Sequence, residues 1–199
     1  LISNDILKNK LKDLKNVRII GSEEEDNLFY TENKEGRFLV CYDPLDGSSN
    51  IDINVTVGTI FAIYDLDKKL VDGNNIVCAG YCLYGSSTQF VIAQENIKMY
   101  MLKNNNFELI KSDLQIKEKG NIYSFNESNK YKWFGNHDNM LIMHLLDNNY
   151  SSRWIGSMVT DCHRTLIKGG IFAYPSNAKD INGKIRLLYE AYPFAFIFK

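Results

Sequence analysis

The stretch RFLVCYDPLDGSSNIDINVTVGTIFAIY, from Arg37 to Tyr64, holds a short polar loop between two apolar runs. Both runs are rich in β-branched and aromatic residues, which predicts strands over Arg37–Tyr42 and Val55–Tyr64. Acids and small polar residues between two strands are typical of a tight turn, but they are also groups that bind cations and anions. The loop residues of this kind are Asp43, Asp46, Gly47, Ser48, Ser49, Asn50 and Asp52.

The composition is that of an ordinary globular protein. With 199 residues, 45% of them hydrophobic, the chain can form one sizeable core or two small cores packed together. A formal net charge of −1 gives no general electrostatic reason to bind nucleic acid or an anionic membrane. No apolar run reaches the roughly 20 residues that span a bilayer, and the N-terminus lacks a signal-peptide pattern, so we expect a soluble cytoplasmic protein.

Two smaller features concern the cysteines and the ends of the chain. The cysteines show no Cys-x-x-Cys spacing and lie in apolar surroundings, so we expect reduced core thiols. They are Cys41, Cys78, Cys82 and Cys162. The chain opens at Leu1 without methionine and stops at Lys199 directly after an apolar run, so we expect a fold truncated at both ends.

Hydrophobic periodicity predicts a β-rich first half that follows an amphipathic helix over Ile2–Leu14. Further strands are expected at Val17–Gly21, Ile76–Tyr84, Thr88–Ala93, Lys98–Leu102, Phe107–Lys111 and Asn121–Phe125. The remainder alternates between helices at Asp138–Leu146 and Ser157–Lys168, strands at Ile171–Tyr174 and Ile185–Tyr189, and a last helix from about Glu190. This pattern favours a mixed α+β and α/β fold with two layered subdomains, residues 1–125 and 126–199.

Acids gather at the ends of three predicted strands. Strand ends on one side of a sheet converge, so these groups could meet although they are far apart in sequence. Each pair of like charges about 4 Å apart would cost roughly 4 kcal/mol at an effective dielectric near 20, which protonation or divalent cations would relieve. Oxygen ligands without a nearby His or Cys cluster favour Mg²⁺, with Mn²⁺ as an alternative. The acids are Glu23, Glu24, Glu25 and Asp26, then Asp43 and Asp46, and finally Glu190.

The segment that follows Asp46 adds a second signal. Consecutive amide groups with small side chains, as in Gly47-Ser48-Ser49-Asn50, form an anion-binding nest. A metal-binding loop joined to a phosphate-binding loop indicates phosphoryl transfer to water. Each piece alone is more often a solvated turn or a helix first turn, and it is the combination at strand ends that favours a functional site.

Four blocks of sequence together resemble one known protein family. They are DPLDGSSNID from Asp43, VGTIFAIY from Val57, GSMVTDCHRTLIKGGIFAYP from Gly156 and GKIRLLYEAYPFAF from Gly183. Together they closely resemble the fructose-1,6-bisphosphatase family, part of the metal-dependent, lithium-sensitive sugar and inositol phosphatases. The resemblance runs from about Val17 to Phe198 and implies a layered αβαβα sugar-phosphatase fold. It also implies a homotetrameric enzyme of gluconeogenesis that uses Mg²⁺.

The resemblance implies roles for the acidic segments. Glu23 would bridge two metal ions, and Glu24 would orient or deprotonate the attacking water. The metal ligands would be completed by Asp43, Asp46, Glu190 and the backbone carbonyl of Leu45. The phosphate that leaves from C1 of the sugar would be held by Gly47, Ser48 and Ser49.

The resemblance likewise implies a site for the sugar and its retained 6-phosphate. Arg153 would reach in from a neighbouring subunit, and Lys179 and Arg186 are weaker candidates of the same kind. Lys and Arg suit a second phosphate because they make charge-assisted hydrogen bonds. The remaining residues implied for this site are Asn126, Tyr131, Trp154, Tyr174 and Lys184.

Several positions depart from the family pattern. Trp154 stands where the family usually has a tyrosine that binds the 6-phosphate, and an extra residue near Tyr131 makes that position's alignment uncertain by one or two places. The AMP inhibition site of the family would involve positions that align with Arg37, Phe38 and Asp65, and only Arg37 keeps the usual residue type. An acid at position 65 would repel a nucleotide phosphate, so we predict weak or absent AMP inhibition. The family's catalytic loop would precede Ile2.

Two other functions stay open at this point. The segment DINVTVGTIF has some features of sedoheptulose-1,7-bisphosphatase, although GSMVTDCHRTL and Leu45 fit the fructose enzyme better. A non-catalytic sugar-phosphate-binding homologue is also compatible with Trp154. The sequence shows no insertion with a cysteine pair of the kind found in plastid enzymes, which favours a cytosolic form.

Overall fold

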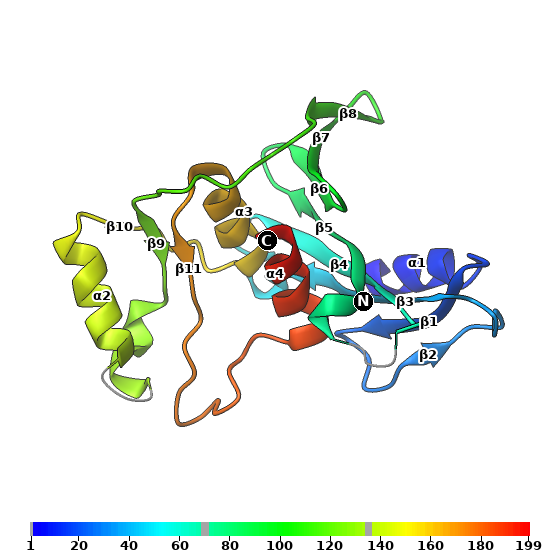
Figure 1. Ribbon diagram of the computed structural model, residues 1–199, viewed down its shortest axis with the longest axis horizontal. Coiled ribbons are helices and arrows are strands. Elements are labelled where there is room, and N and C mark those ends of the chain that lie inside the picture. The colour runs from blue at the N-terminus through cyan, green and yellow to red at the C-terminus, as the bar shows by residue number, and fades with distance from the viewer. Residues whose placement is uncertain (1, 69–71, 134–136) are drawn as a thin grey trace. The chain divides into compact units, whose positions relative to one another are not determined.

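A computed structural model describes residues 2–68, 72–133 and 137–199, and the chain divides into two compact units. Unit 1 consists of Leu1–Leu114 and Arg186–Lys199, and unit 2 consists of Gln115–Ile185 (Figure 1). The subdomains expected from the sequence, 1–125 and 126–199, differ from these units at two places. The segment 115–125 lies in unit 2, and residues 186–199 return to unit 1.

Unit 1 is built around one eight-stranded mixed sheet with the order β2-β1-β3-β4-β5-β6-β7-β8. Strands β1 and β3 run parallel, and the other neighbouring pairs are antiparallel. The strands are β1 (Val17–Ser22), β2 (Phe29–Tyr30), β3 (Phe38–Asp46), β4 (Val57–Asp65), β5 (Ile76–Tyr84), β6 (Thr88–Ala93), β7 (Ile97–Lys103) and β8 (Asn106–Lys111).

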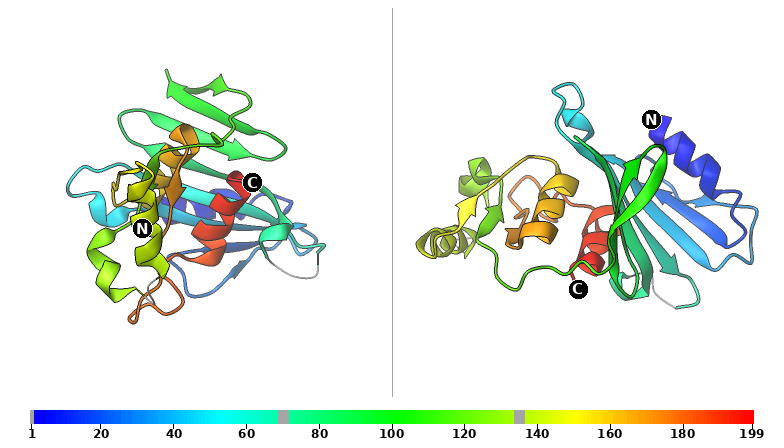
Figure 2. Two further views of the ribbon diagram at one scale, coloured as in Figure 1. Left: turned by 60° about the vertical axis from the view of Figure 1, so that its left-hand side comes forward. Right: turned by 90° about the horizontal axis from the view of Figure 1, so that it is seen from above.

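Helices cover both faces of this sheet, as the view from above shows (Figure 2). Side chains alternate between the faces of a strand, so Val40 and Tyr42 of β3 share one face. They pack there with Leu7 and Leu11 of helix α1 (Ile2–Leu11). On the other face lies helix α4 (Tyr192–Ile197), where the ring of Phe194 lies 5.2 Å from that of Tyr81.

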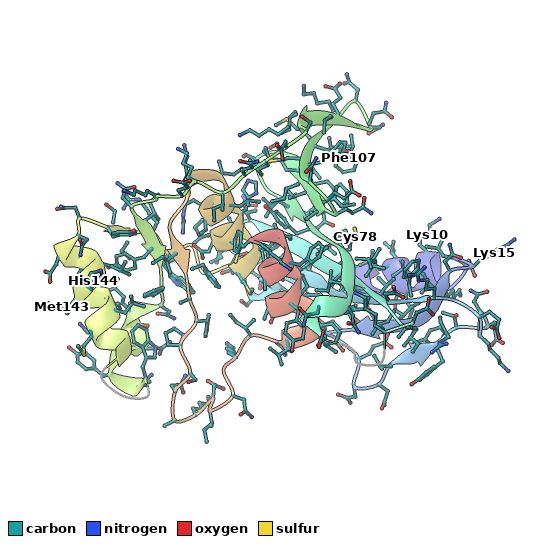
Figure 3. All side chains as sticks on the ribbon, in the orientation of Figure 1. Lys10, Lys15, Cys78, Phe107, Met143 and His144 are labelled. Carbon is teal, nitrogen blue, oxygen red and sulfur yellow. The ribbon has the colours of Figure 1, made fainter. Side chains whose placement is uncertain are left out.

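The predicted amphipathic helix is only partly confirmed by α1. Lys10 is exposed as expected (Figure 3), and Leu7 and Leu11 pack on the sheet, but Ile2 and Ile6 are 79 and 57% exposed. Phe107 on the edge strand β8 remains 47% exposed (Figure 3). All four cysteines are free thiols, and Cys41, Cys78 and Cys162 are buried, as expected from the sequence.

Unit 2 contains a small parallel sheet with the order β10-β9-β11. Its core is formed by Tyr123, Phe125, Trp133, Ile142 and Leu145. The strands are β9 (Ile122–Ser124), β10 (Ser151–Ser152) and β11 (Ile171–Phe172), and the helices are α2 (His137–Asp147) and α3 (Met158–Lys168). None of the helices in the described ranges is long and apolar enough to cross a membrane.

Most predicted elements are observed, with one clear error. Strands β5 and β6 have the predicted bounds, whereas the first helix ends at Leu11 rather than Leu14. The predicted strand Ile185–Tyr189 is wrong, because Leu187–Ala191 forms a π-helical turn, η4, that leads into α4. Tyr64 of β4 donates its hydroxyl to the carbonyl of Leu188 at 2.9 Å, so tertiary contact with the sheet holds this turn.

Candidate metal and phosphate site

Two aspartates at the end of β3 and one glutamate of η4 meet in unit 1. Asp43, Asp46 and Glu190 each offer a carboxylate oxygen, and these three atoms lie within 4.8 Å of one another. The three residues are only 5, 8 and 7% exposed. The sequence analysis expects these acids to converge, and the fold brings them together from segments about 145 residues apart.

An irregularity in the sheet aims both aspartates at the same place. Asp43 pairs with Ile60 and Asp46 with Gly58, so three steps along β3 match two along β4. Residues three apart in a regular strand point to opposite faces, and the extra residue of a β-bulge corrects this. The hydroxyl of Thr59 donates to the carbonyl of Pro44 at 2.9 Å and stabilises the bulged segment.

The η4 turn delivers the third carboxylate. The backbone N–H of Arg186 donates to Oε2 of Glu190 at 2.5 Å, which turns this side chain back across the start of η4. Single π-helical turns are rare and occur frequently at functional sites. Glu190 thus reaches the aspartates from a turn. The sequence instead predicts that it lies at the end of a strand.

Burial and mutual repulsion raise the affinity of this cluster for protons. The pKa of Asp43 is raised to about 7, mainly by burial and also by the charges of Asp46, Glu190 and Glu23, while a hydrogen bond from the Leu45 N–H lowers it. Burial likewise raises the pKa of Glu190 to about 7, and Asp46 and Glu23 contribute. A divalent cation would compensate these charges, and the all-oxygen donor set fits such an ion.

Glu23 borders the cluster and carries an ion pair. Its Oε1 lies 2.5 Å from Nη2 of Arg186, and its backbone N–H donates to the carbonyl of Tyr42 at 3.0 Å. The Glu23 side chain is 14% exposed and that of Arg186 is 53% exposed. The sequence suggests Arg186 only as a weak candidate for phosphate binding. No local pattern reveals its contact with Glu23, because the two residues come from distant segments.

The next two acids of the GSEEED segment have different surroundings. Glu24 is exposed, and its N–H donates to the Ser22 hydroxyl at 3.3 Å. Glu25 is held by α1, since Lys8 Nζ and Asn4 Nδ2 donate to its carboxylate at 2.8 and 2.9 Å. The hydrogen bond from Lys8 is the largest cause of a lowered pKa at Glu25. Of this acidic run, Glu23 alone is seen to act electrostatically on Asp43 and Glu190.

A tight turn follows the second aspartate directly. Gly47 adopts the left-handed conformation, with φ 78°, and precedes the 3₁₀ turn η1 (Ser48–Asn50). The N–H of Asn50 donates to the carbonyl of Gly47 at 2.8 Å, and Ser48 and Ser49 are exposed. Left-handed and right-handed residues in succession form the backbone concavity that binds anions. Leu45 is half-buried, and its N–H donates to Oδ1 of Asp43 at 2.8 Å.

In unit 2, two of the predicted sugar-binding residues contact each other. The Trp154 ring stacks on Phe172, with centroids 6.4 Å apart and planes 8° apart. The Tyr174 ring lies 6.1 Å from that of Trp154. Arg153 is exposed, and its guanidinium donates to the carbonyl of Ser152 at 2.8 Å.

Three other predicted residues of unit 2 are seen with other contacts or exposed. Tyr131 is 88% exposed, and Lys130 Nζ lies 4.9 Å from its ring centroid. Asn126 accepts a hydrogen bond from the Ser128 hydroxyl at 2.6 Å, and Lys184 is exposed. The fold therefore unites Trp154 and Tyr174 and shows no such contact for these three within the described ranges.

Comparison with known proteins decides the family. The family model described as "Fructose-1-6-bisphosphatase, N-terminal domain" matches residues 1–113, and the one described as the C-terminal domain matches residues 116–199. The chain belongs to the fructose-1,6-bisphosphatase family. The acidic cluster and the Gly47 turn lie within the N-terminal match apart from Glu190, which falls in the C-terminal match.

Individual fructose-1,6-bisphosphatases are similar over nearly the whole chain. A class 1 enzyme from Sulfurihydrogenibium is 45% identical over 98% of the chain, and fructose-1,6-bisphosphatase 1 from Bos taurus is 43% identical over 99%. The crystal structure of Leishmania major fructose-1,6-bisphosphatase in holo form has a TM-score of 0.92 at 42% identity, covering 98% of this chain and 67% of that one. The chain spans 64 and 63% of the length of the first two relatives. The mixed α/β fold and the sequence analysis agree with this family.

Proposed function

We propose that the protein is a Mg²⁺-dependent phosphatase that hydrolyses the 1-phosphate of fructose 1,6-bisphosphate and yields fructose 6-phosphate. The observation that carries this proposal is the buried group of Asp43, Asp46 and Glu190, followed directly by the turn at Gly47. A cation site joined to an anion-binding turn suits a phosphate ester. The many fructose-1,6-bisphosphatases among the relatives support the substrate.

The metal ligands would be Glu23, Asp43, Asp46, Glu190 and the carbonyl of Leu45. Mg²⁺ fits oxygen donors of this kind, and Mn²⁺ is the alternative. When bound, such an ion polarises a phosphoryl oxygen and lowers the pKa of a water molecule. The β3 bulge and η4 already hold three of these carboxylates together, and Glu23 at their border would have to exchange its ion pair with Arg186 for the metal ion.

The remaining groups of unit 1 would handle the phosphate and the proton. The amides of Gly47, Ser48 and Ser49 would bind the phosphoryl oxygens, since small exposed residues leave the backbone accessible. Glu24, exposed beside Glu23, would orient the attacking water and accept its proton. A new P–O bond to the water oxygen forms while the P–O bond to the C1 oxygen breaks, and that oxygen takes up a proton.

Unit 2 would bind the sugar and its retained 6-phosphate. Trp154 and Tyr174 offer an aromatic surface with an indole N–H and a phenolic hydroxyl as donors. Cationic groups suit the phosphate, with Arg153 contributed to a neighbouring subunit of a homotetramer. The further residues of this site would be Asn126, Tyr131 and Lys184. We place the enzyme in gluconeogenesis in the cytoplasm, as for the cytosolic relative from Arabidopsis thaliana.

Phosphate release on addition of Mg²⁺ and fructose 1,6-bisphosphate tests the proposal. We expect turnover that is abolished by a chelator and that exceeds turnover of sedoheptulose 1,7-bisphosphate. Preference for the seven-carbon substrate would assign the protein to that second activity. Binding of fructose 6-phosphate without any phosphate release would instead indicate a non-catalytic binding protein.

A further inference from the structure

The segment 153–156 of unit 2 has no regular secondary structure of its own. It connects β10 to α3 and carries both Arg153 and Trp154. A binding segment of this kind is useful only if its backbone is fixed, because a misplacement of about 1 Å is enough to weaken a site. The contacts that fix it are therefore of functional interest.

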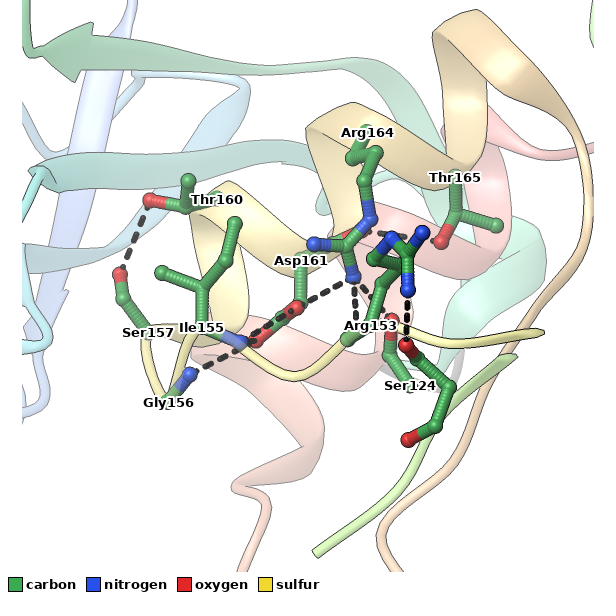
Figure 4. Close-up of polar contacts among 10 residues, drawn as sticks. Ser124, Arg153, Ile155, Gly156, Ser157, Thr160, Asp161, Arg164 and Thr165 are labelled. Carbon is green, nitrogen blue, oxygen red and sulfur yellow. Dashed lines mark hydrogen bonds and ion pairs between the residues drawn. The ribbon is translucent and has the colours of Figure 1, made fainter. Parts of the chain in front are cut away.

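The carboxylate of Asp161 holds one end of this segment (Figure 4). Asp161 lies in the first turns of α3 and is 0% exposed. Its Oδ1 accepts a hydrogen bond from the Ile155 N–H at 3.1 Å, and its Oδ2 accepts one from the Gly156 N–H at 3.0 Å. A carboxylate that accepts backbone N–H groups makes strong charge-assisted hydrogen bonds.

Arg164 holds the other end and joins it to the sheet (Figure 4). Its Nη2 lies 2.6 Å from Oδ1 of Asp161 and also donates to the carbonyl of Arg153 and the hydroxyl of Ser124. Ser124, at the end of β9, donates in turn to the Arg153 carbonyl at 2.7 Å. One guanidinium thus connects helix α3, strand β9 and the backbone of residue 153.

The Trp154 ring lies directly beside the backbone that is held. Gly156 adopts φ +88°, and a Cβ built there would lie 3.6 Å from Nε1 of the Trp154 indole. The indole also stacks on Phe172 of β11. The ring therefore lies close both to the backbone fixed by Asp161 and to an aromatic residue of the sheet.

We infer that Asp161 and Arg164 are a pair of positioning residues that fix segment 153–156 and so present Arg153 and Trp154 to the retained phosphate of the sugar. The role in phosphate binding rests on the proposed function. The fixing of the segment rests on the contacts alone. Neither residue was identified in the sequence analysis, and neither is proposed to touch the substrate.

A purely structural role would be to start helix α3. Asp161 does lie near the helix N-terminus, where carboxylates are stabilising. Such a role would require neither the second contact of Arg164 with the Arg153 carbonyl nor its contact with Ser124. The two roles differ in what a mild variant changes: helix stability in one case, the environment of Trp154 and phosphate affinity in the other.

Labelling with 5-fluorotryptophan provides a direct readout, because the chain has 2 tryptophans, Trp133 and Trp154. Each should give its own ¹⁹F resonance, assigned with Trp154→Phe. In Asp161→Asn we expect the Trp154 resonance to shift and broaden while that of Trp133, in the core of unit 2, stays in place. Lys168→Met removes an exposed charge from the same helix and should change neither signal. An unchanged Trp154 resonance in Asp161→Asn would overturn the inference.

Titration with fructose 6-phosphate, followed by the same resonance and by calorimetry, tests the functional part. We expect roughly tenfold weaker binding in Asp161→Asn, in line with the loss of supporting contacts at other sites, and wild-type binding in Lys168→Met. If the wild-type protein binds no fructose 6-phosphate but Trp154 still responds to Asp161→Asn, the fixed segment stands and the proposed substrate fails. Equal affinity in wild type and Asp161→Asn contradicts the positioning role.

If the Trp133 resonance shows that Asp161→Asn does not fold, Arg164→Lys replaces it. A lysine keeps the positive charge, but its Nζ lies one bond nearer the backbone than the Nη2 atom that contacts Asp161, Ser124 and the Arg153 carbonyl, and it lacks the rigid planar guanidinium. We expect this variant to fold and to shift Trp154 alone. A Trp154 signal and a phosphate affinity identical to those of the wild type would again overturn the inference.

Discussion

The two units bury carboxylates in opposite ways. Asp161 of unit 2 has an arginine at 2.6 Å and two backbone N–H donors. In unit 1, Asp43, Asp46 and Glu190 face one another within 4.8 Å, and the nearby Arg186 pairs with Glu23 at their border. In the first arrangement, the negative charge of Asp161 is balanced by Arg164 and by hydrogen bonds. The second is stable only with protons or a cation, and this difference separates a supporting contact from a binding site.

Asp65 shows the same contrast within unit 1. Arg37 donates from Nε and Nη2 to the two oxygens of Asp65 at 3.0 and 2.6 Å. These hydrogen bonds lower the pKa of Asp65 to about 2, whereas burial raises the pKa of Asp43 to about 7. The presence or absence of a matched cation decides the direction of the shift.

The largest effect is expected for Asp46→Asn. Loss of this carboxylate should reduce Mg²⁺-dependent phosphate release by roughly a thousandfold, since losing a group that merely supports a metal ligand already costs roughly 10–100-fold. The metal-free variant should unfold at a higher temperature at pH 8, because one of the repelling charges is gone. Asp52→Asn, an exposed acid of the same loop, is the matched control and should behave like the wild type. Near-normal turnover in Asp46→Asn would refute the assignment.

Removal of the buried carboxylate of unit 2 should destabilise the protein, whereas Asp46→Asn should stabilise its metal-free form. Asp161→Ala leaves the guanidinium of Arg164 without its partner and should lower the free energy of unfolding by roughly 3–5 kcal/mol, measured by urea denaturation. Asp147→Ala removes an exposed carboxylate of the same unit and should have little effect. A stabilising Asp161→Ala would mean that the contrast between the two arrangements is mistaken.

The pH dependence of stability should reveal the incomplete cluster. The pKa values of Asp43 and Glu190 are raised from 3.8 and 4.5 to about 7, so their protonation stabilises the metal-free fold. This contribution is complete below about pH 4 and is lost as the pH rises through 7. Mg²⁺ at about 100 times its dissociation constant should restore roughly 2.7 kcal/mol at pH 8 and much less at pH 5. Thermal unfolding with Mg²⁺ or a chelator at both pH values measures this stabilisation. Equal shifts of the unfolding temperature at pH 5 and pH 8 would contradict the assignment of Asp43 and Glu190 to a metal site.

A smaller effect is expected for Arg186→Met. The half-exposed guanidinium competes with a cation for Glu23, so its removal should tighten Mg²⁺ binding by roughly two- to fivefold, the range for exposed ion pairs. Isothermal titration with Mg²⁺ in the absence of substrate measures this. Lys184→Met is the control for metal binding, because it removes an exposed positive charge close to Arg186 in the sequence and leaves the ion pair between Arg186 and Glu23 intact. Weaker Mg²⁺ binding in Arg186→Met would show that the arginine supports the site.

The smallest effect is expected for AMP. Arg37 is the retained cation of the inhibitor site implied by the family resemblance, and it is already occupied by Asp65 and, at 3.1 Å, by Asp67. A nucleotide phosphate would have to displace both carboxylates. Titration of AMP into the phosphatase assay should therefore cause little inhibition. Strong inhibition would show that this ion pair opens readily.

The sequence predicts most of unit 1 because its strands are long and strongly patterned. The runs that become β5 and β6 are bounded by turn residues on both sides, and their limits are those expected. The sequence also predicts that acids at the ends of buried segments could converge, but it places Glu190 at the end of a strand, whereas Glu190 lies in η4. The error at Ile185–Tyr189 has a different origin, since a short apolar run does not reveal whether it will pair with a strand or be held as a turn by Tyr64.

Local pattern and composition alone predicted most of the strands, the loop that carries acids, and the small residues that follow it. Only the tertiary structure decided which acids share a site: the β3 bulge turns Asp46 to the side of Asp43, η4 adds Glu190, and α1 draws Glu25 away. It also decided that Arg164 joins Asp161 to Ser124 and residue 153. Hydrogen bonds and ion pairs between distant segments depend on where the backbone carries each group in space, and periodicity along the chain holds no information about that.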